Sequence, residues 1–211
     1  MAKENRVNKD VLLTEVRLRN AYLDKPFVGK NDKGEATQTY SIRALFNPGT
    51  PAHTALSAAI QEVAAAKWGA QAGAYIQEMA AADRLCLHDG ATKASDPEFV
   101  GKKFVSATSR RKPRTLVTRM GRNVDIDASD PCFPYAGCWA NVLLNVWPQD
   151  PKGQWPRRIN AEVIAVQFLR HDEAFTGGGA PQVNLDEFPL VETAGADAEP
   201  PAAAGQGGGL L

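Results

Sequence analysis

The stretch Trp139-Ala-Asn-Val-Leu-Leu-Asn-Val-Trp147 decides the fold class, because its residues alternate between two kinds of side chain. One face is apolar and consists of Ala140, Val142, Leu144 and Val146. The opposite face carries tryptophan and asparagine together with Leu143. This alternation predicts a β-strand with one face in the core. Residues 131–149 lack charge, but prolines and amides interrupt them, so we expect strands here and no membrane span.

Similar alternation predicts four further strands, over residues 11–23, 39–46, 102–108 and 157–170. Between the second and third strands, the Ala-rich run 52–68 and the shorter run 74–82 show helical spacing. The chain is therefore predicted to be mainly β: an antiparallel, five-stranded barrel with a helical insertion at about 51–82. A β-sandwich is the alternative architecture.

Charge divides the chain into a basic body and an acidic end. Residues 1–170 carry a formal charge of +7 and residues 171–211 carry −7, which gives a net charge of zero. We expect a flexible leader at 1–9, a single domain at 10–190 and a disordered acidic, Gly/Ala/Pro-rich tail at 191–211. A basic body with an acidic tail is typical of a protein that binds a polyanion.

Residues 101–124 hold eight lysines and arginines and no acid. Single-stranded nucleic acid is bound by cations that contact phosphates and by aromatic rings that stack on unpaired bases. Tyr22, Tyr40 and Phe46 share strand faces with aliphatic residues and are expected in the core, although the mouth of a barrel could expose Tyr40. The candidate nucleic-acid-binding residues are Arg17, Arg19, Arg43, Lys102, Lys103, Arg110, Arg111, Lys112, Arg114, Tyr135, Trp139, Trp147 and Trp155.

Two metal sites are weaker alternatives. A zinc site would draw on scattered residues, whose spacing is not that of a zinc knuckle: Cys86, His88, Cys132 and Cys138. A magnesium site would use Asp125, Asp127 and Asp130, but no accompanying nucleophile or base is evident. We expect no metal, no cofactor and no catalytic residue, and the cysteines are expected to be buried, reduced thiols.

Several segments, taken in order, resemble phage single-stranded DNA-binding proteins with an OB-fold. They are Leu87-His-Asp-Gly90, residues 99–108 with Arg110-Arg-Lys-Pro113, Tyr135-Ala-Gly-Cys-Trp139, and residues 165–172 with Phe175 and Gly177-Gly178. The resemblance spans about residues 10–190. It implies an OB-fold-like barrel and a non-catalytic, largely sequence-independent protein that coats single-stranded DNA in phage replication or recombination. The N-terminal residues show no apolar stretch typical of a secretion signal, so we expect a cytoplasmic location, which is the host cytoplasm if a phage encodes the protein.

Further expectations concern partners. The acidic tail is expected to compete with DNA for the basic groove, or to recruit replication or recombination proteins, and a homo-oligomer is compatible with the sequence. A metal-dependent nuclease acting on branched or single-stranded DNA is the alternative function. A third reading is a structural protein whose charges serve self-assembly.

Overall fold

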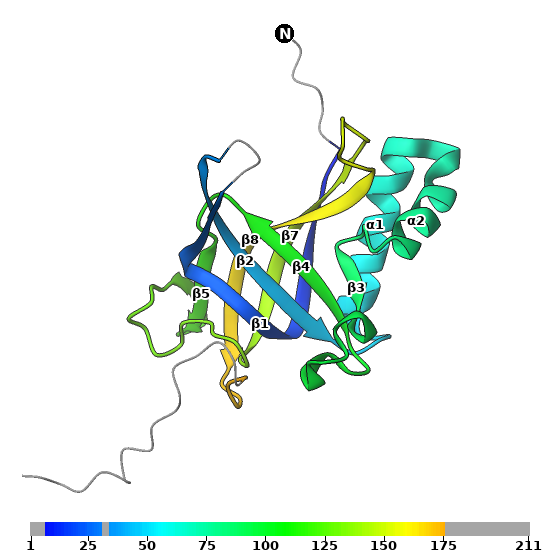
Figure 1. Cartoon of the computed structure of the whole chain (residues 1–211). Coiled ribbons are helices and arrows are strands. Elements are labelled where there is room, and N and C mark those ends of the chain that lie inside the picture. Colours follow the sequence, from blue (N-terminus) through cyan, green and yellow to red (C-terminus); the bar gives the residue numbers. More distant parts are fainter. Residues whose placement is uncertain (1–6, 31–33, 176–211) are drawn as a thin grey trace, which may run out of the picture. The chain divides into compact units, whose positions relative to one another are not determined.

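The computed structural model describes residues 7–30 and 34–175 (Figure 1). The predicted acidic tail at 191–211 lies outside the described residues. The described chain forms eight strands, two α-helices and three short 3₁₀ turns. In chain order these are β1 (Lys9–Lys30), β2 (Ala36–Phe46), α1 (Pro51–Trp68), η1 (Gly69–Gln71), α2 (Ala72–Ala81), β3 (Leu87–Asp89), η2 (Gly90–Lys93), η3 (Pro97–Phe99), β4 (Lys103–Ser109), β5 (Arg114–Arg119), β6 (Arg122–Asp125), β7 (Trp139–Gln149) and β8 (Arg158–Arg170).

The strands form one sheet in the order β3-β4-β2-β1-β7-β8-β5-β6. Its strand pairs are antiparallel except β5 with β8, which run parallel. The five predicted strands are present as β1, β2, β4, β7 and β8. The prediction of a purely antiparallel, five-stranded barrel is corrected by β3, β5 and β6. β3 and β6 have only three and four residues, too few for alternation to be visible in the sequence.

The hydrogen-bonded ladder does not close, but its strands curve so that β4 approaches β8. One hydrogen bond joins β4 to β8, and a second joins β8 to the segment before β3. The Ser109 hydroxyl donates to Glu162 Oε1 at 3.0 Å, and the Ile159 amide donates to the Arg84 carbonyl oxygen at 3.1 Å. We call this approach the seam.

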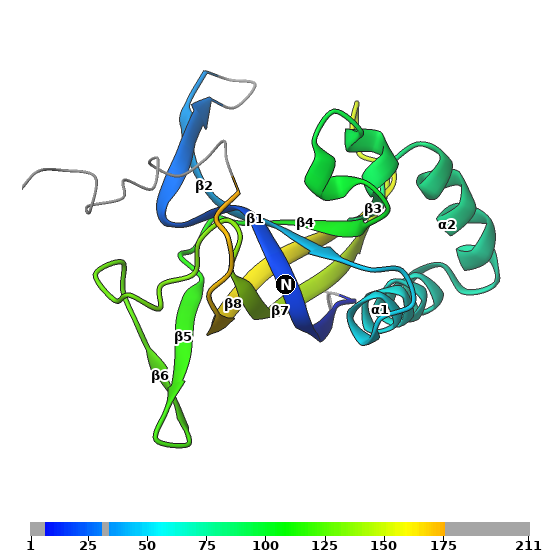
Figure 2. The ribbon, with the colours of Figure 1, turned by 90° about the horizontal axis from the view of Figure 1, so that it is seen from below.

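The core lies on the inner face of the sheet and beneath α1. All four apolar residues of the β7 face are fully buried, as predicted. The helical insertion is also confirmed: α1 lies against β1 and β7 (Figures 1 and 2). Its buried residues include Leu56, Ile60 and Val63. Thr50 caps α1 by accepting a hydrogen bond from the His53 amide, and Gly69 ends the helix at φ 55°.

No helix within the described part of the chain is long and apolar enough to cross a bilayer.

The prediction that Tyr22 is a core residue is wrong, since 49% of it is exposed. The register of β1 against β2 shifts between Arg19 and Tyr22, and Asn20 takes a positive φ of 54°. This bulge changes which side chains point inward, so that Leu23 is fully buried in place of Tyr22. Phe46 is buried as predicted, and Tyr40 is half-buried.

Candidate nucleic-acid interface

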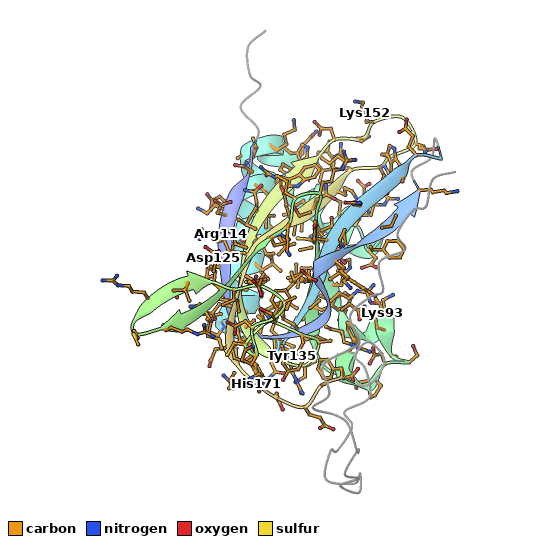
Figure 3. The ribbon with its side chains drawn as sticks, turned by 90° about the vertical axis from the view of Figure 1, so that its left-hand side faces the viewer. Lys93, Arg114, Asp125, Tyr135, Lys152 and His171 are labelled. Atoms are coloured by element: carbon orange, nitrogen blue, oxygen red, sulfur yellow. The ribbon has the colours of Figure 1, made fainter. Side chains whose placement is uncertain are left out.

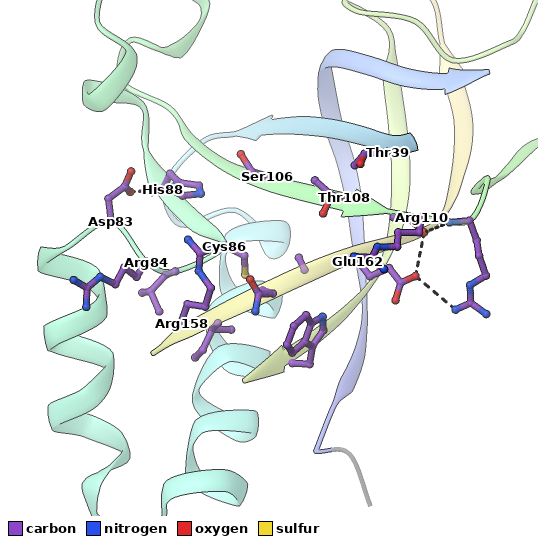
Figure 4. A pocket seen from close by; sticks show the side chains of 17 residues that line it. Thr39, Asp83, Arg84, Cys86, His88, Ser106, Thr108, Arg110, Arg158 and Glu162 are labelled. Atoms are coloured by element: carbon purple, nitrogen blue, oxygen red, sulfur yellow. Dashed lines mark hydrogen bonds and ion pairs between the residues drawn. The ribbon is translucent and has the colours of Figure 1, made fainter. Parts of the chain in front are cut away.

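A groove of 750 Å³ lies at the seam, between β4 and β8 (Figure 4). Its walls come from β4, from the N-terminal half of β8, and from the segment between α2 and β3. Trp147 of β7 also lines it. Four of the lining residues are arginines: Arg84, Arg110, Arg111 and Arg158.

Most of these guanidinium groups are available to a ligand. Neither Arg110 nor Arg158 makes a side-chain hydrogen bond or ion pair with any described residue. Arg84 Nη1 lies 3.8 Å from Glu78 Oε1, which is a loose contact at the surface. Arg111 pairs with Glu162 at 3.5 Å, yet 84% of its side chain remains exposed. Cations of this kind lose little when they turn toward a phosphate.

The two carboxylates of the groove are both engaged. Asp83 Oδ1 lies 2.7 Å from His88 Nδ1, at the end of the groove that also holds Arg84 (Figure 4). Glu162 accepts the seam hydrogen bond and pairs with Arg111 at the other end. The groove therefore has more cationic than anionic groups.

Part of the groove is lined by hydroxyl side chains from β2 and β4. Thr39, Ser106 and Thr108 line it. Arg43 is directly opposite Ser106 in the register of β2 and β4, and directly opposite residues share a face of the sheet. Arg43 is half-buried and has no ion pair among the residues the structure describes. It therefore lies beside the groove.

A different group of predicted residues is covered by residues 171–175, which we call the strap. Arg17 donates to the Gly137 carbonyl oxygen at 3.0 Å and to the Glu173 carbonyl oxygen at 2.9 Å. Its guanidinium lies 4.3 Å above the Phe175 ring. A Cβ at Gly137 would collide with the Glu173 carbonyl oxygen, so only glycine allows the strap to lie this close.

Two predicted aromatic residues hold the same strap. The Tyr135 hydroxyl donates to the Asp172 carbonyl oxygen at 2.8 Å, and the Tyr135 ring stacks on His171 (Figure 3). The Trp139 indole donates to Asp172 Oδ2 at 2.7 Å, and this bond holds the pKa of the carboxyl below its usual range. Both side chains thus have structural partners.

The remaining predicted residues are distributed around the body. Arg19 pairs with Asp96 at 3.0 Å and Glu98 at 3.5 Å, beside Phe175. Trp155 is 49% exposed in the β7–β8 connection. The other four each have a close oxygen partner: Lys102 with Asn47 at 2.6 Å, Lys103 with Asp89 at 2.6 Å, Lys112 with Asp24 at 2.8 Å and Arg114 with Asp125 at 2.7 Å (Figure 3).

The structure therefore brings Arg110, Arg111 and Trp147 to the groove, but not the whole predicted set. Two lining cations, Arg84 and Arg158, were not among the predicted residues. Each is separated in sequence from the basic window at 101–124, and no local pattern distinguishes it from a solubilising charge. Only the approach of β4 to β8 reveals them.

The alternative metal sites have little support in the geometry. Burial raises the pKa of the Cys86 thiol to about 12 and that of Cys138 to about 11, which disfavours the thiolate that zinc requires. Asp125 and Asp130 form ion pairs with Arg114 and Arg119 at 2.7 Å. Residues 7–30 and 34–175 contain no group of three or more His, Cys, Asp or Glu side chains placed to hold a metal ion.

Comparison with known proteins identifies relatives. Protein p50 of Acyrthosiphon pisum secondary endosymbiont phage 1 is 27% identical over 184 residues, covering 84% of this chain and 96% of p50. The single-stranded DNA-binding protein of bacteriophage Enc34, solved in complex with ssDNA, matches with a TM-score of 0.61 and 23% identity over 82% of this chain and 96% of that one.

The fold also matches gp2.5, a single-stranded DNA-binding protein encoded by bacteriophage T7, with a TM-score of 0.51 and 12% identity. That match covers 89% of this chain and 98% of gp2.5. The family model described as the ssDNA-binding protein of Enterobacter phage Enc34 matches residues 9–198. The chain belongs to this Enc34-type family of phage single-stranded DNA-binding proteins.

Proposed function

We propose that this chain is a non-catalytic protein that binds single-stranded DNA in the groove, largely without regard to sequence. It would coat and protect exposed strands during phage DNA replication or recombination in the host cytoplasm. Membership of the Enc34-type family supports the activity, and the relative solved with ssDNA supports the ligand. The groove at the seam is the observation in this chain that carries the proposal.

The lining groups match the two halves of a nucleotide. Arg110 and Arg158 have no competing partner among described residues, so each can donate to a phosphate oxygen without breaking an ion pair. Trp147 lines both the groove and an adjoining pocket that also includes Arg111. An indole at that point can stack on a base next to a phosphate held by Arg111. Stacking accepts every base, so it would allow binding largely without regard to sequence.

The proposal extends to the organisation of the chain. Residues 10–190 would form the binding domain, an OB-type barrel opened at the seam, and residues 191–211 would form an acidic tail. The tail would compete with DNA for the groove cations or recruit replication or recombination proteins. We expect truncation after Phe188 to tighten DNA binding at low salt, whereas unchanged affinity would reduce the tail to a linker.

Titration with oligo-dT at two salt concentrations tests the function. Tryptophan emission should be quenched as bases stack, and the affinity should fall steeply with salt because each neutralised phosphate adds about 0.7 to the log–log slope. A flat response at low salt would refute the proposal. Incubation of labelled DNA with Mg²⁺ or Mn²⁺ tests the nuclease alternative, which would require cleavage that is lost in Asp125→Ala with Asp127→Ala.

A further inference from the structure

The sheet ends at β6, which pairs on one side only. Among the described strands its partner is β5 alone, and all four residues of β6 are exposed. The β5–β6 hairpin projects away from the rest of the body (Figure 2). A strand at the edge of a sheet presents unpaired amide and carbonyl groups, to which another strand can add. The outer edge of β6 is therefore a surface on which a partner strand can dock.

The turn of the hairpin determines which backbone groups face outward. Met120 and Gly121 form a two-residue turn with positive φ angles of 50° and 73°, the pattern of a type I′ turn. The residues that flank such a turn bond to each other, so Arg122 directs its backbone groups toward β5, and the direction then alternates along the strand. The Ile126 amide accordingly donates inward, to the Thr115 carbonyl oxygen at 2.9 Å. The odd-numbered residues of β6 direct their backbone groups outward.

These outward groups belong to Asn123 and Asp125, and neither residue makes an outward backbone hydrogen bond to a described part of the chain. Their side chains also have capacity to spare. The Asn123 oxygen accepts from Thr118 Oγ1 at 2.8 Å and from Gln167 Nε2 at 2.9 Å, which leaves its NH₂ group as a donor. The Asp125 side chain is 60% exposed although it pairs with Arg114. An amide donor and a carboxylate acceptor thus lie two residues apart on one face.

This edge is complementary to a second copy of itself. A two-fold axis at Val124 sets each Asn123 opposite the partner's Asp125, which pairs all the outward backbone groups of both copies. The Asn123 amide then faces a carboxylate to which it can donate. An axis at Asp125 would oppose two carboxylates, which repel each other. An axis at Asn123 would set Asp125 opposite Gly121 of the partner's turn, so the register at Val124 is the most favourable.

The same register covers the apolar side chain of the strand. Val124 is 36% exposed, and it lies opposite Val117, which is buried. Around an axis at Val124, the two copies of this valine face each other in a non-hydrogen-bonded pair, the kind of pair in which side chains come closest. Apolar contact therefore adds to the backbone hydrogen bonds.

We propose that β6 adds to the β6 strand of a second copy of this chain, around a two-fold axis at Val124, so that the two sheets become continuous. The contact uses four residues of each copy, fewer than the roughly 20 residues a side of a standard interface, so it is weak in free solution. Copies held on one DNA strand have a high effective concentration, which favours the contact. Only this last step depends on the proposed function.

Cysteine substitution tests the register. Val124→Cys places two thiols directly across the axis, at a Cα separation of about 4.5 Å, which a disulfide allows. Met120→Cys is the control, because Met120 is more exposed on the same hairpin but lies far from the axis. With oxidised glutathione, Val124→Cys should form disulfide-linked dimers at least about 10-fold faster than Met120→Cys, and long oligo-dT should raise its rate further. The parent protein measures the background from its three native cysteines.

The outcomes separate the pairing from the proposed function. Equal rates in the two cysteine variants would overturn the pairing, whether or not the protein binds oligo-dT. If Val124→Cys links rapidly without DNA, and oligo-dT neither binds nor changes the rate, the pairing stands and the proposed function fails. Thermal unfolding of both variants should match that of the parent, because each side chain is at least partly exposed.

Opposite charges at Val124 test the two-fold axis itself. Val124→Lys alone and Val124→Asp alone each oppose like charges across the axis, so each should lose the concentration-dependent association that the parent shows in sedimentation equilibrium. An equimolar mixture of the two variants opposes unlike charges and should recover it. Association of either variant at the parental level, or a mixture that stays as weak as its components, would show that the axis does not lie at Val124 and would overturn the proposal.

Discussion

The groove at the seam and the surface beneath the strap contain the same kinds of residue, but their arginines differ in how many protein partners they have. Both surfaces present arginine beside tryptophan. In the groove, Arg110 and Arg158 have no partner among the described residues, and Arg111 is 84% exposed. Beneath the strap, Arg17 makes two hydrogen bonds to carbonyl oxygens and stacks on Phe175. The difference teaches that the partners of a cation, more than its identity, determine whether it is free to bind phosphate.

The energetic reason is the cost of exchange. An arginine that already donates to two carbonyl oxygens must break those bonds before it can donate to a phosphate, which returns little net energy. An arginine that faces only water exchanges water for a charge-assisted hydrogen bond. We therefore propose that the strap surface serves stability and that the groove serves DNA binding, and substitutions can test whether these two roles are separate.

The largest effect is expected on stability, from Phe175→Ala in the strap. Phe175 is only 8% exposed and packs with Leu45, Phe99 and Phe104 in a small cluster apart from the main core. Truncation of a buried phenylalanine costs about 3 kcal/mol or more of unfolding free energy, measured by urea denaturation. DNA affinity of the folded variant should stay within about twofold of the parent.

Met120→Ala is the control for this truncation, because Met120 is fully exposed at the tip of the β5–β6 hairpin and should not affect stability. If Phe175→Ala left the unfolding free energy unchanged, the strap would not be part of the folded body. If it abolished DNA binding in the folded protein, the separation of the two surfaces would be wrong.

The next effect is expected on binding, from the double substitution Arg110→Ala with Arg158→Ala. Loss of two hydrogen bonds from charged donors, at about 1.5 kcal/mol each, predicts oligo-dT binding weaker by about 100-fold. The log–log salt slope should fall by about 1.4. Unfolding free energy should change by less than about 0.5 kcal/mol, because neither side chain has a partner to lose.

Arg122→Ala is the matched control for charge. Arg122 is exposed on β6, outside the residues that line the groove, and has no ion pair within the described ranges. It should cost little affinity. A loss in Arg122→Ala equal to that of the groove pair would mean that DNA responds to overall charge and not to the groove.

How much of the fold the sequence could predict depends on whether an element has a local sequence pattern. The β7 strand and α1 were predictable because alternation and helical spacing are local properties, and Val142, Leu144 and Ile60 are buried accordingly. The β5–β6 hairpin was missed because its stability comes from pairing across strands. Arg114 and Asp125 join its two strands, and β5 pairs in parallel with β8. Neither feature leaves a local pattern.

The candidate site was predictable in composition but not in arrangement. The basic window at 101–124 pointed to Arg110 and Arg111, both of which line the groove. The same window contains Lys103, Lys112 and Arg114, which pair with carboxylates that are 11 to 88 residues away in sequence. Such pairing depends on tertiary approach, which a count of charges cannot anticipate.

The smallest effect is expected from Glu162→Gln. This substitution tests whether the carboxylate next to Arg111 weakens DNA binding by competing with phosphate for the guanidinium. Glu162 holds Arg111 at 3.5 Å and accepts from Ser109 at 3.0 Å. Glutamine keeps an oxygen for Ser109 but removes the charge that competes with phosphate. A surface ion pair is worth about 0.2 to 1 kcal/mol, so affinity for oligo-dT should rise by about 2- to 5-fold.

The salt slope gives this prediction a second, independent signature. If the substitution frees Arg111 for one more phosphate, the slope should steepen by about 0.7. Glu15→Gln is the matched control, because Glu15 pairs with Arg170 at 3.4 Å beside the strap. That variant removes the same charge from an ion pair of nearly the same length and should leave both affinity and slope unchanged. Equal tightening in the two variants would show that net charge, and not the state of Arg111 in the groove, sets the affinity.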